Sequence, residues 1–304
     1  MNEQGQNIFV IETQNLTKCY GKKTVLDTVS MHVARGDIYG FIGKNGAGKT
    51  TLMKLLLGMS HATSGDIQLF GSSALSQGRR RIGALIEAPA FYTQCTAYEN
   101  LKRFALLVND GQDLHALLDF VGLGHVGKKK VGKFSLGMKQ RLGIAIAMLG
   151  NPELLVLDEP INGLDPEGIK EIRDLLLRLN HEKNVTILVS SHLLDELAKI
   201  TTRYGIINNG RLVEEITAAA LAEQCQQNLQ IFTEQVTEAT KVIHKLYPAA
   251  KLETIEGGLA VAAENLDSVA VNRALVMANI SVSELMYATQ NMEAYFIQRM
   301  GGKA

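Results

Sequence analysis

Hydrophobic positions in the N-terminal part of the chain gather in short, nearly unbroken apolar runs, separated by stretches with helical spacing. Residues 38–42, 154–157 and 185–189 are such runs, and none shows the alternation of a half-exposed strand. Runs of this kind are typical of strands that are buried on both faces of a parallel sheet. A helix is expected around residues 169–179, between two of these runs. The pattern therefore predicts an α/β fold in which helices cover both faces of a parallel sheet.

A β-rich region is predicted at the N-terminus, before and around the first buried run. Residues 8–10 and 24–33 are expected to be strands, with a turn over residues 18–23 between them. Residues 64–71 are expected to form a strand between turns, and residues 82–87 a strand that ends in a carboxylate. These segments predict a second, smaller sheet beside the parallel one.

The apolar spacing becomes helical from residue 88 onward. Leu101, Phe104, Ala105 and Val108 recur three or four positions apart, as the core-facing side of a helix requires. A longer helix is expected to open near residue 134 and to run through residue 149. We therefore expect a helical subdomain over about residues 88–150.

The pattern restarts after about residue 220, which predicts two domains, residues 1–220 and a small α+β domain over residues 221–304. The expected elements are strand 229–232, helix 234–246, hairpin 252–262 about Gly257-Gly258, helix 266–277, strand 280–282 and helix 285–300. This β-α-β-β-α-β order is that of ferredoxin-like domains. The apolar side of the last helix is expected to dock on this domain through Leu285, Met292, Tyr295, Phe296 and Met300. A docking or dimerisation role and a purely stabilising role both remain open for the C-terminal domain.

Residues 43–50, Gly-Lys-Asn-Gly-Ala-Gly-Lys-Thr, fit the phosphate-binding pattern G-x-x-x-x-G-K-[ST] between a predicted strand and a predicted helix. Glycines let successive backbone N–H groups converge on phosphate oxygens at the positive end of the helix. Lys49 would reach the β- and γ-phosphates, and the hydroxyl of Thr50 would ligate Mg²⁺. A glycine-rich turn that binds nothing is the alternative, but the flanking elements favour nucleoside triphosphate binding. The residues predicted to hold the nucleotide are Gly43, Asn45, Gly46, Ala47, Gly48, Lys49, Thr50 and Thr51.

Acidic residues follow the apolar run 154–157, and a histidine follows the run 185–189. Asp158 at the end of a buried strand would hold Mg²⁺, and Glu159 would orient and polarise the attacking water. His192 could hydrogen-bond the γ-phosphate and that water. A lone histidine at a strand end is more often structural, so this role for His192 depends on the surrounding motifs.

Composition narrows the setting in which this chemistry takes place. The chain has 304 residues, of which 46% are hydrophobic, and 31 basic side chains balance 31 acidic ones. This balance gives no net field that would attract nucleic acid. The three cysteines are scattered without C-x-x-C spacing, which suits a reducing compartment. No apolar run approaches the ~18 residues of a membrane helix. We expect a cytoplasmic protein with no direct insertion into a membrane.

Taken in order, these motifs resemble those of the ATP-binding subunits of ABC transporters over residues 8–220. In that light Tyr20 resembles the aromatic residue that stacks on adenine, and Asp165, in Asn162-Gly163-Leu164-Asp165, resembles the D-loop aspartate. His192 resembles the switch histidine. The resemblance implies ATP and Mg²⁺ as cofactors, a P-loop NTPase fold and an ATP hydrolase.

Ser135 and Gly137 resemble two residues of the family signature L-S-G-G-Q, although Leu136 and Met138 depart from it. In this family the signature meets the γ-phosphate that the opposite subunit holds. The resemblance therefore implies a homodimer with two ATP molecules sandwiched between head-to-tail domains. It also implies an integral membrane permease as partner, which would place the chain on the inner face of the cell membrane.

Glu87 stands where the family usually has a glutamine that contacts Mg²⁺. A carboxylate retains a hard oxygen ligand, with one more negative charge beside the triphosphate. The alternative is a strand-end acid that points to solvent. Together with Ser135–Met138 and residues 291–296, Glu87 resembles the subgroup that serves lantibiotic self-immunity and bacitracin resistance by exporting membrane-active peptides.

Three other functions remain open beside this one. An exporter of another substrate would share every motif. A soluble ABC ATPase of translation or DNA repair would generally carry two nucleotide domains and strongly basic segments, whereas this chain has one phosphate loop and balanced charge. A P-loop kinase would not need the signature stretch or His192.

Overall fold

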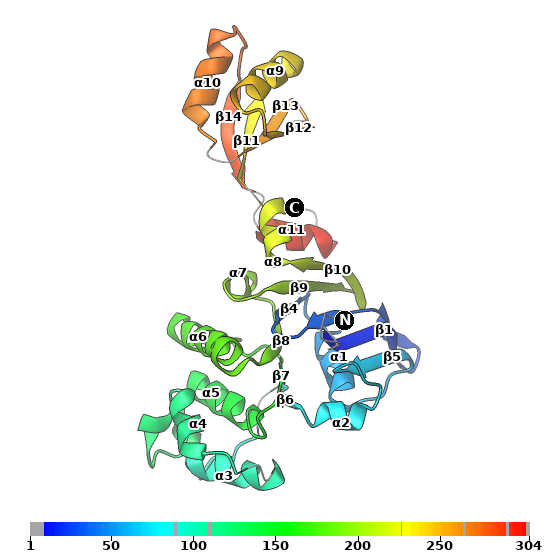
Figure 1. Cartoon of the computed structure of the whole chain (residues 1–304), viewed down its shortest axis with the longest axis vertical. Coiled ribbons are helices and arrows are strands. Elements are labelled where there is room, and N and C mark those ends of the chain that lie inside the picture. The colour runs from blue at the N-terminus through cyan, green and yellow to red at the C-terminus, as the bar shows by residue number, and fades with distance from the viewer. Residues whose placement is uncertain are drawn as a thin grey trace, which may run out of the picture. The chain divides into compact units, whose positions relative to one another are not determined.

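The computed structural model describes residues 9–87, 90–108, 111–225, 227–263, 266–289 and 292–301. The chain divides into two compact units (Figure 1). The large unit comprises Met1–Ala218 together with Phe296–Ala304, and the small unit comprises Ala219–Tyr295. Within the described ranges, no helix is long and apolar enough to cross a membrane.

The large unit is built on a six-stranded sheet whose strand order is β10-β9-β4-β8-β7-β6. The first five strands in sequence run parallel, and only β10 is antiparallel to its neighbour. All residues of β4, β7 and β8 are buried, which confirms the parallel sheet expected from the apolar runs. The strands are β4 (Ile38–Ile42), β6 (Ile82–Leu85), β7 (Leu154–Leu157), β8 (Thr186–Ser191), β9 (Arg203–Asn208) and β10 (Arg211–Thr217).

A second sheet forms the N-terminal part of the large unit. Strand β1 (Phe9–Tyr20) pairs with β2 (Lys23–Val29), β3 (His32–Ala34) and β5 (Ser64–Leu69). The turn expected over residues 18–23 is wrong in extent, because β1 continues through Tyr20, whose register partner is Lys23. Because β1 is long, it can form backbone hydrogen bonds with all three neighbouring strands.

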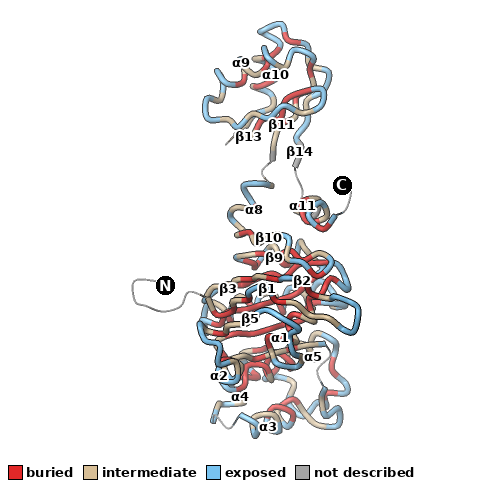
Figure 2. Tube along the Cα trace, turned by 90° about the vertical axis from the view of Figure 1, so that its right-hand side faces the viewer, coloured by how far each residue is buried: buried red, intermediate tan, exposed pale blue. Residues whose placement is uncertain are grey.

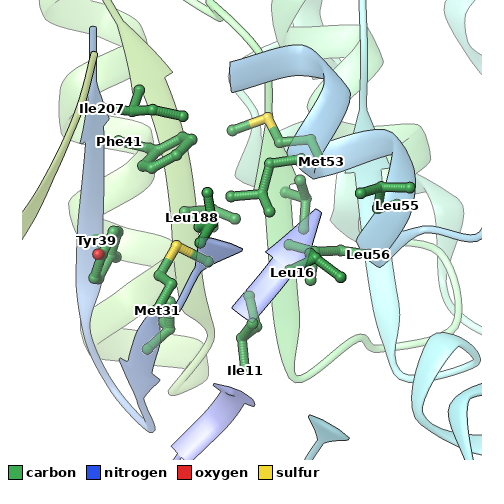
Figure 3. Packing of buried hydrophobic residues seen from close by; sticks show 14 of the residues in the cluster. Ile11, Leu16, Met31, Tyr39, Phe41, Met53, Leu55, Leu56, Leu188 and Ile207 are labelled. Carbon is green, nitrogen blue, oxygen red and sulfur yellow. The ribbon is translucent and has the colours of Figure 1, made fainter. Parts of the chain in front are cut away.

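The main core of the large unit lies between the two sheets and helix α1 (Lys49–Leu56). Figure 3 shows Ile11 of β1 and Met31, which directly precedes β3, together with Tyr39, Phe41 and Leu188 of the central sheet. Buried stretches follow the strands in Figure 2. This packing fixes the start of α1 against the end of β4.

Helices cover the other face of the central sheet, where Figure 1 places α6 (Pro166–Lys183) and α7 (Leu194–Ala198). Asp165 caps α6 through its side chain, Pro166 occupies the first turn, and Asn184 ends the helix in a left-handed conformation. The remaining helices of this unit are α2 (Leu75–Arg79), α3 (Ala97–Val108), α4 (Leu114–Phe120) and α5 (Leu136–Ala147), with single turns at Gly124–Val126 and Val131–Lys133.

The small unit is an antiparallel sheet in the order β12-β13-β11-β14, with α9 and α10 in the β-α-β-β-α-β connections. This order and connectivity are those of the ferredoxin-like fold expected from the sequence. Leu229, Ile231 and Val261 of the sheet pack with Ile243 and Leu275 of the helices. The elements are β11 (Gln227–Phe232), α9 (Val236–Leu246), β12 (Lys251–Ile255), β13 (Gly258–Ala262), α10 (Ser268–Met277) and β14 (Glu284–Thr289); α8 (Ala218–Gln224) precedes them.

The helix expected over residues 285–300 and the strand expected over residues 280–282 are both wrong. Residues Glu284–Thr289 form β14, because the backbone of this segment pairs with β11 in a continuous antiparallel register. The last helix is only α11 (Met292–Arg299). A short apolar segment fits either period, and strand pairing decides between them.

The end of the chain belongs to the large unit, so the small unit is inserted between residues 218 and 296. The ring of Phe296 is fully buried with its centroid 5.5 Å from that of Tyr204. Nε of Arg299 lies 3.0 Å from Oε2 of Glu214. The docking on the C-terminal domain that the sequence predicts is therefore wrong for Phe296 and Met300, whereas Leu285 does pack against the core of the small unit.

Candidate functional site

A glycine-rich loop connects the buried strand β4 to α1. Gly48 has φ +111°, and a Cβ there would lie 2.7 Å from Cδ2 of Leu26. A Cβ on Gly43 would lie 2.6 Å from the carbonyl oxygen of Ile207. Both positions therefore need glycine. No side chain caps the start of α1, so its first N–H groups remain available to an anion.

A pocket of about 250 Å³ opens at this loop. Its lining includes six of the eight residues that the sequence predicts for phosphate binding: Asn45, Gly46, Gly48, Lys49, Thr50 and Thr51. Glu159 and Val25 complete the lining. The other two, Gly43 and Ala47, are buried residues of the loop and do not line the pocket. Val25 was missed, since an apolar residue inside a strand gives no signal of ligand contact.

Lys49 brings a positive charge to the base of this pocket. Its side chain is only 6% exposed, and Nζ donates a hydrogen bond of 2.6 Å to the carbonyl oxygen of Gly43. Nζ also lies 3.5 Å from Oε1 of Glu159. Nζ also donates a longer hydrogen bond of 3.4 Å to the carbonyl oxygen of Lys44. Because the contacts to Lys44 and Glu159 are long, the ammonium can turn to a closer anionic partner.

A hydrogen-bond network links α1 to the ends of β7 and β8. The hydroxyl of Thr50 donates to Oδ2 of Asp158 at 2.7 Å, and the hydroxyl of Ser190 donates to Oδ1 at 2.6 Å. Ser190 in turn accepts the backbone N–H of Glu159 at 2.9 Å. Ser190 is not among the residues predicted from the sequence, although a polar residue at the end of an apolar run is a signal that could have found it.

Glu159 and His192 meet at the same end of the sheet. Nδ1 of His192 lies 2.8 Å from Oε2 of Glu159. Oε1 of Glu159 is buried and has no hydrogen-bond partner among the described residues. Glu159 also has φ +49°, a left-handed conformation that is uncommon outside glycine. His192 thus fixes the carboxylate at Oε2, while Oε1 faces the ammonium of Lys49.

These groups fit a nucleoside triphosphate with magnesium. The loop and Lys49 offer donors to phosphate, and Thr50 with Asp158 offers the hard oxygen atoms that Mg²⁺ prefers. Within the described part of the chain, no cluster of three or more His, Cys, Asp or Glu side chains could hold a metal ion. Magnesium here would therefore need oxygen ligands from the phosphates or from water.

Glu87 and Tyr20 do not line this pocket. Oε1 of Glu87 accepts a hydrogen bond of 2.7 Å from Nζ of Lys54, and the Glu87 side chain is 65% exposed. Tyr20 ends β1, half-exposed, with Nζ of Lys18 4.7 Å from its ring centroid. The structure thus places a basic partner beside each of these two predicted ligands.

Ser135, Gly137 and Asp165 come together in a second pocket of about 520 Å³. Ser135 caps α5 by accepting the N–H of Met138, and Asp165 caps α6 by accepting the N–H of Gly168. The two pockets have no lining residue in common. The predicted signature contacts are thus separate, within one chain, from the predicted phosphate contacts.

Three comparisons with known proteins bear on this site. The sequence profile of the family described as ABC transporter matches residues 26–162. The bacitracin transport ATP-binding protein BcrA of Bacillus licheniformis is 41% identical over 299 residues, which cover 96% of this chain and 98% of that protein. The lantibiotic transport ATP-binding protein SrtF of Streptococcus pyogenes is 44% identical over 207 residues, which cover 68% of this chain and 90% of that protein. A solved structure of an ATP-binding subunit of an ABC transporter matches with TM-score 0.61 at 29% identity, covering 71% of this chain and 92% of that one.

Proposed function

Because this chain belongs to the family of ATP-binding subunits of ABC transporters, we propose that it hydrolyses magnesium-bound ATP to drive a separate membrane permease, which exports a membrane-active peptide antibiotic. The observation that carries the proposal is the network from Thr50 through Asp158 and Ser190 to Glu159 beside the glycine-rich loop. It joins Thr50 and Glu159, which both line the pocket, to the carboxylate of Asp158.

Each residue of the pocket has a separate task in this reaction. The N–H groups at the start of α1 and the ammonium of Lys49 bind the β- and γ-phosphates. Thr50 and Asp158 hold Mg²⁺, which when bound offsets the charge that develops on the phosphoryl oxygens. Oε1 of Glu159 orients the attacking water and accepts its proton. His192 keeps the Glu159 carboxylate turned toward the pocket.

A complete site requires a second copy of the chain. The pocket lined by Ser135, Gly137 and Asp165 supplies a hydroxyl and the start of α5 to the nucleotide that the opposite protomer holds. The homodimer therefore encloses two ATP molecules. Tyr20, at the exposed end of β1, stacks on adenine when nucleotide binds.

The permease places the ATPase on the inner face of the cell membrane. The cargo follows from the similarity to proteins of bacitracin and lantibiotic transport, of which the first spans nearly all of this chain. Closure and reopening of the dimer move the helical part that contains α3, α4 and α5, against which the permease rests.

Purification of the tagged chain from mildly solubilised membranes tests the partner. A polytopic membrane protein in near-equal amount is the expected result, whereas recovery of ribosomal or DNA-bound material alone would overturn the proposal. Growth in bacitracin and in a lantibiotic then tests the cargo, by comparing the wild type with Glu159→Gln and with the remote control Glu182→Gln. Resistance should be lost only in Glu159→Gln.

A further inference from the structure

Lys54 and Glu87 form an ion pair one helical turn beyond Thr50. Lys54 lies four residues after Thr50 on α1, and side chains at this spacing share one face of a helix. Helical side chains also lean toward the N-terminus of their helix. The Lys54 stem therefore extends toward Thr50, and Nζ donates to Oε1 of Glu87 at 2.7 Å.

Two acidic residues, Glu87 and Asp158, contribute to the electrostatic surroundings of Lys54. Its hydrogen bond to Glu87 raises the pKa of Lys54 above its usual value, and the charge of Asp158 acts in the same direction. One ammonium therefore interacts with Glu87 and with the carboxylate that binds Thr50. Its charge offsets the additional negative charge that Glu87 brings where the family usually has glutamine.

The backbone ties Glu87 to the same strand ends as the pocket. Two residues before it, the carbonyl oxygen of Leu85 accepts the N–H of Asp158 at 2.8 Å. Glu87 itself has φ +60°, which non-glycine residues rarely adopt. Its side chain is 65% exposed, so the carboxylate can change partner by rotation while the strand β6 stays in place.

We propose that Lys54 is a positioning residue that holds Glu87 before nucleotide binds and releases it to magnesium-bound ATP. This inference rests on the proposed function. The exchange of partner by Glu87 connects occupancy of the pocket to the chain that continues from Glu87 toward α3. Lys54 thus competes with the magnesium ion for one carboxylate, and Mg²⁺-dependent binding must break the ion pair.

A double-mutant cycle on the full-length chain tests this competition. The variants are Lys54→Met, Glu87→Gln and the double variant, and the readout is the affinity for a fluorescent ATP analogue with Mg²⁺ and with EDTA. Lys54→Met also removes a positive charge near the phosphates, which weakens ATP binding with and without Mg²⁺. This general effect cancels in the ratio of the two dissociation constants. Lys54→Met should raise the preference for Mg²⁺ about two- to fivefold, as expected for an exposed ion pair. In the Glu87→Gln background the same change should leave the preference unaltered.

Two results would overturn the proposal. One is an unchanged or lowered Mg²⁺ preference in Lys54→Met. The other is that Lys54→Met changes the Mg²⁺ preference equally in the wild-type and the Glu87→Gln backgrounds. Lys54 would then act through its charge alone and not through its ion pair with Glu87. If the wild-type chain bound no ATP at all, the proposed function would fail instead, so the two failures are distinguishable.

A second measurement uses fluorescence to follow the chain that continues after Glu87. The chain contains no tryptophan, so Tyr92→Trp, five residues after Glu87, gives a single fluorescent reporter. Tyr92 is 52% exposed and its ring lies 4.7 Å from the guanidinium of Arg103. In the nucleotide-free state, adding Lys54→Met should move the emission toward that of the Mg-ATP-bound chain. Identical nucleotide-free spectra with and without Lys54 would contradict the inference.

Discussion

Nδ1 of His192 lies 2.8 Å from Oε2 of Glu159, across the ends of the neighbouring parallel strands β8 and β7. The second oxygen of the same carboxylate is buried, has no hydrogen-bond partner within the described residues, and lies 3.5 Å from Nζ of Lys49. His192 therefore holds one oxygen of this carboxylate, while the other faces the Lys49 ammonium at the base of the pocket. This arrangement supports Glu159 as the residue that positions the attacking water.

Glu159→Gln should separate binding from hydrolysis. The amide keeps the size of the side chain but cannot accept a proton from water, so the ATPase rate should fall about 10²–10⁴-fold, the usual contribution of a general base. Affinity for Mg-ATP should stay within a few-fold of the wild type. Steady-state phosphate release and equilibrium binding of an ATP analogue measure the two effects. Glu182→Gln, on the exposed side of α6, serves as the matched control and should alter neither. A full ATPase rate in Glu159→Gln would remove this residue from the reaction.

Ser190→Ala should weaken both the fold and the site. Ser190 is fully buried, donates to Asp158 and accepts the N–H of Glu159, so alanine leaves two buried polar groups without their partner. Each such loss costs about 1–3 kcal/mol of unfolding free energy. Denaturant unfolding measures this loss of stability. The Mg²⁺ dependence of ATP binding shows whether Asp158 still functions after losing its hydrogen bond from Ser190. Unfolding free energies that agree within about 0.5 kcal/mol, the range of an inert surface change, would refute the role of Ser190.

The local chemistry of the pocket could be predicted because adjacent residues carry it. In residues 43–50 the spacing of Gly43, Gly48 and Lys49 already specifies a tight strand-to-helix turn with an ammonium at its base. The ferredoxin-like order was predictable for a similar reason. All its elements before β14 show their own period, and Gly257 marks the turn of the hairpin that joins β12 and β13.

Contacts between distant segments could not be predicted from the sequence. Ser190 reaches Asp158 only because β8 lies next to β7, and Lys54 reaches Glu87 only because β6 ends beside α1. The segment from Leu285 to Phe296 shows the same limit. Its apolar spacing fits one long helix, but pairing with β11 makes the first part a strand, and Tyr204 of the large unit buries the last. These contacts and the secondary structure of this segment depend on tertiary packing, which the local sequence does not specify.

Phe296→Ala should destabilise the large unit, although residue 296 is only a few positions from the end of the chain. Phe296 is fully buried against Tyr204, and Phe→Ala changes at such positions cost about 3–5 kcal/mol of unfolding free energy. Calorimetry of the full chain should show a lowered transition for the large unit. Met277→Ala, at a position 77% exposed on α10, is the control and should leave every transition unchanged. Equal melting profiles for the two variants would show that α11 does not stabilise the large unit.

Glu153 should make stability depend on pH in the acidic range. Its carboxylate accepts two hydrogen bonds from Arg81 and one from Arg35, and the bonds from Arg81 above all lower the pKa of Glu153 from 4.5 to about 2. The folded chain therefore binds fewer protons than the unfolded chain between these two values. By linkage, the contribution of Glu153 is complete above about pH 4.5 and is lost as the pH falls toward about 2.

The size of this contribution is limited by solvent, because the Glu153 side chain is 39% exposed. Screening reduces it to about 1 kcal/mol, the upper range of exposed ion pairs. Urea unfolding of the wild type and Glu153→Gln at several pH values measures the difference in unfolding free energy. The difference should be largest near neutral pH and should shrink between about pH 4.5 and 2, because Glu153 takes up a proton there and becomes uncharged like the glutamine. A difference that stays constant over this range would mean that Glu153 stabilises the fold through packing, with no part for its charge.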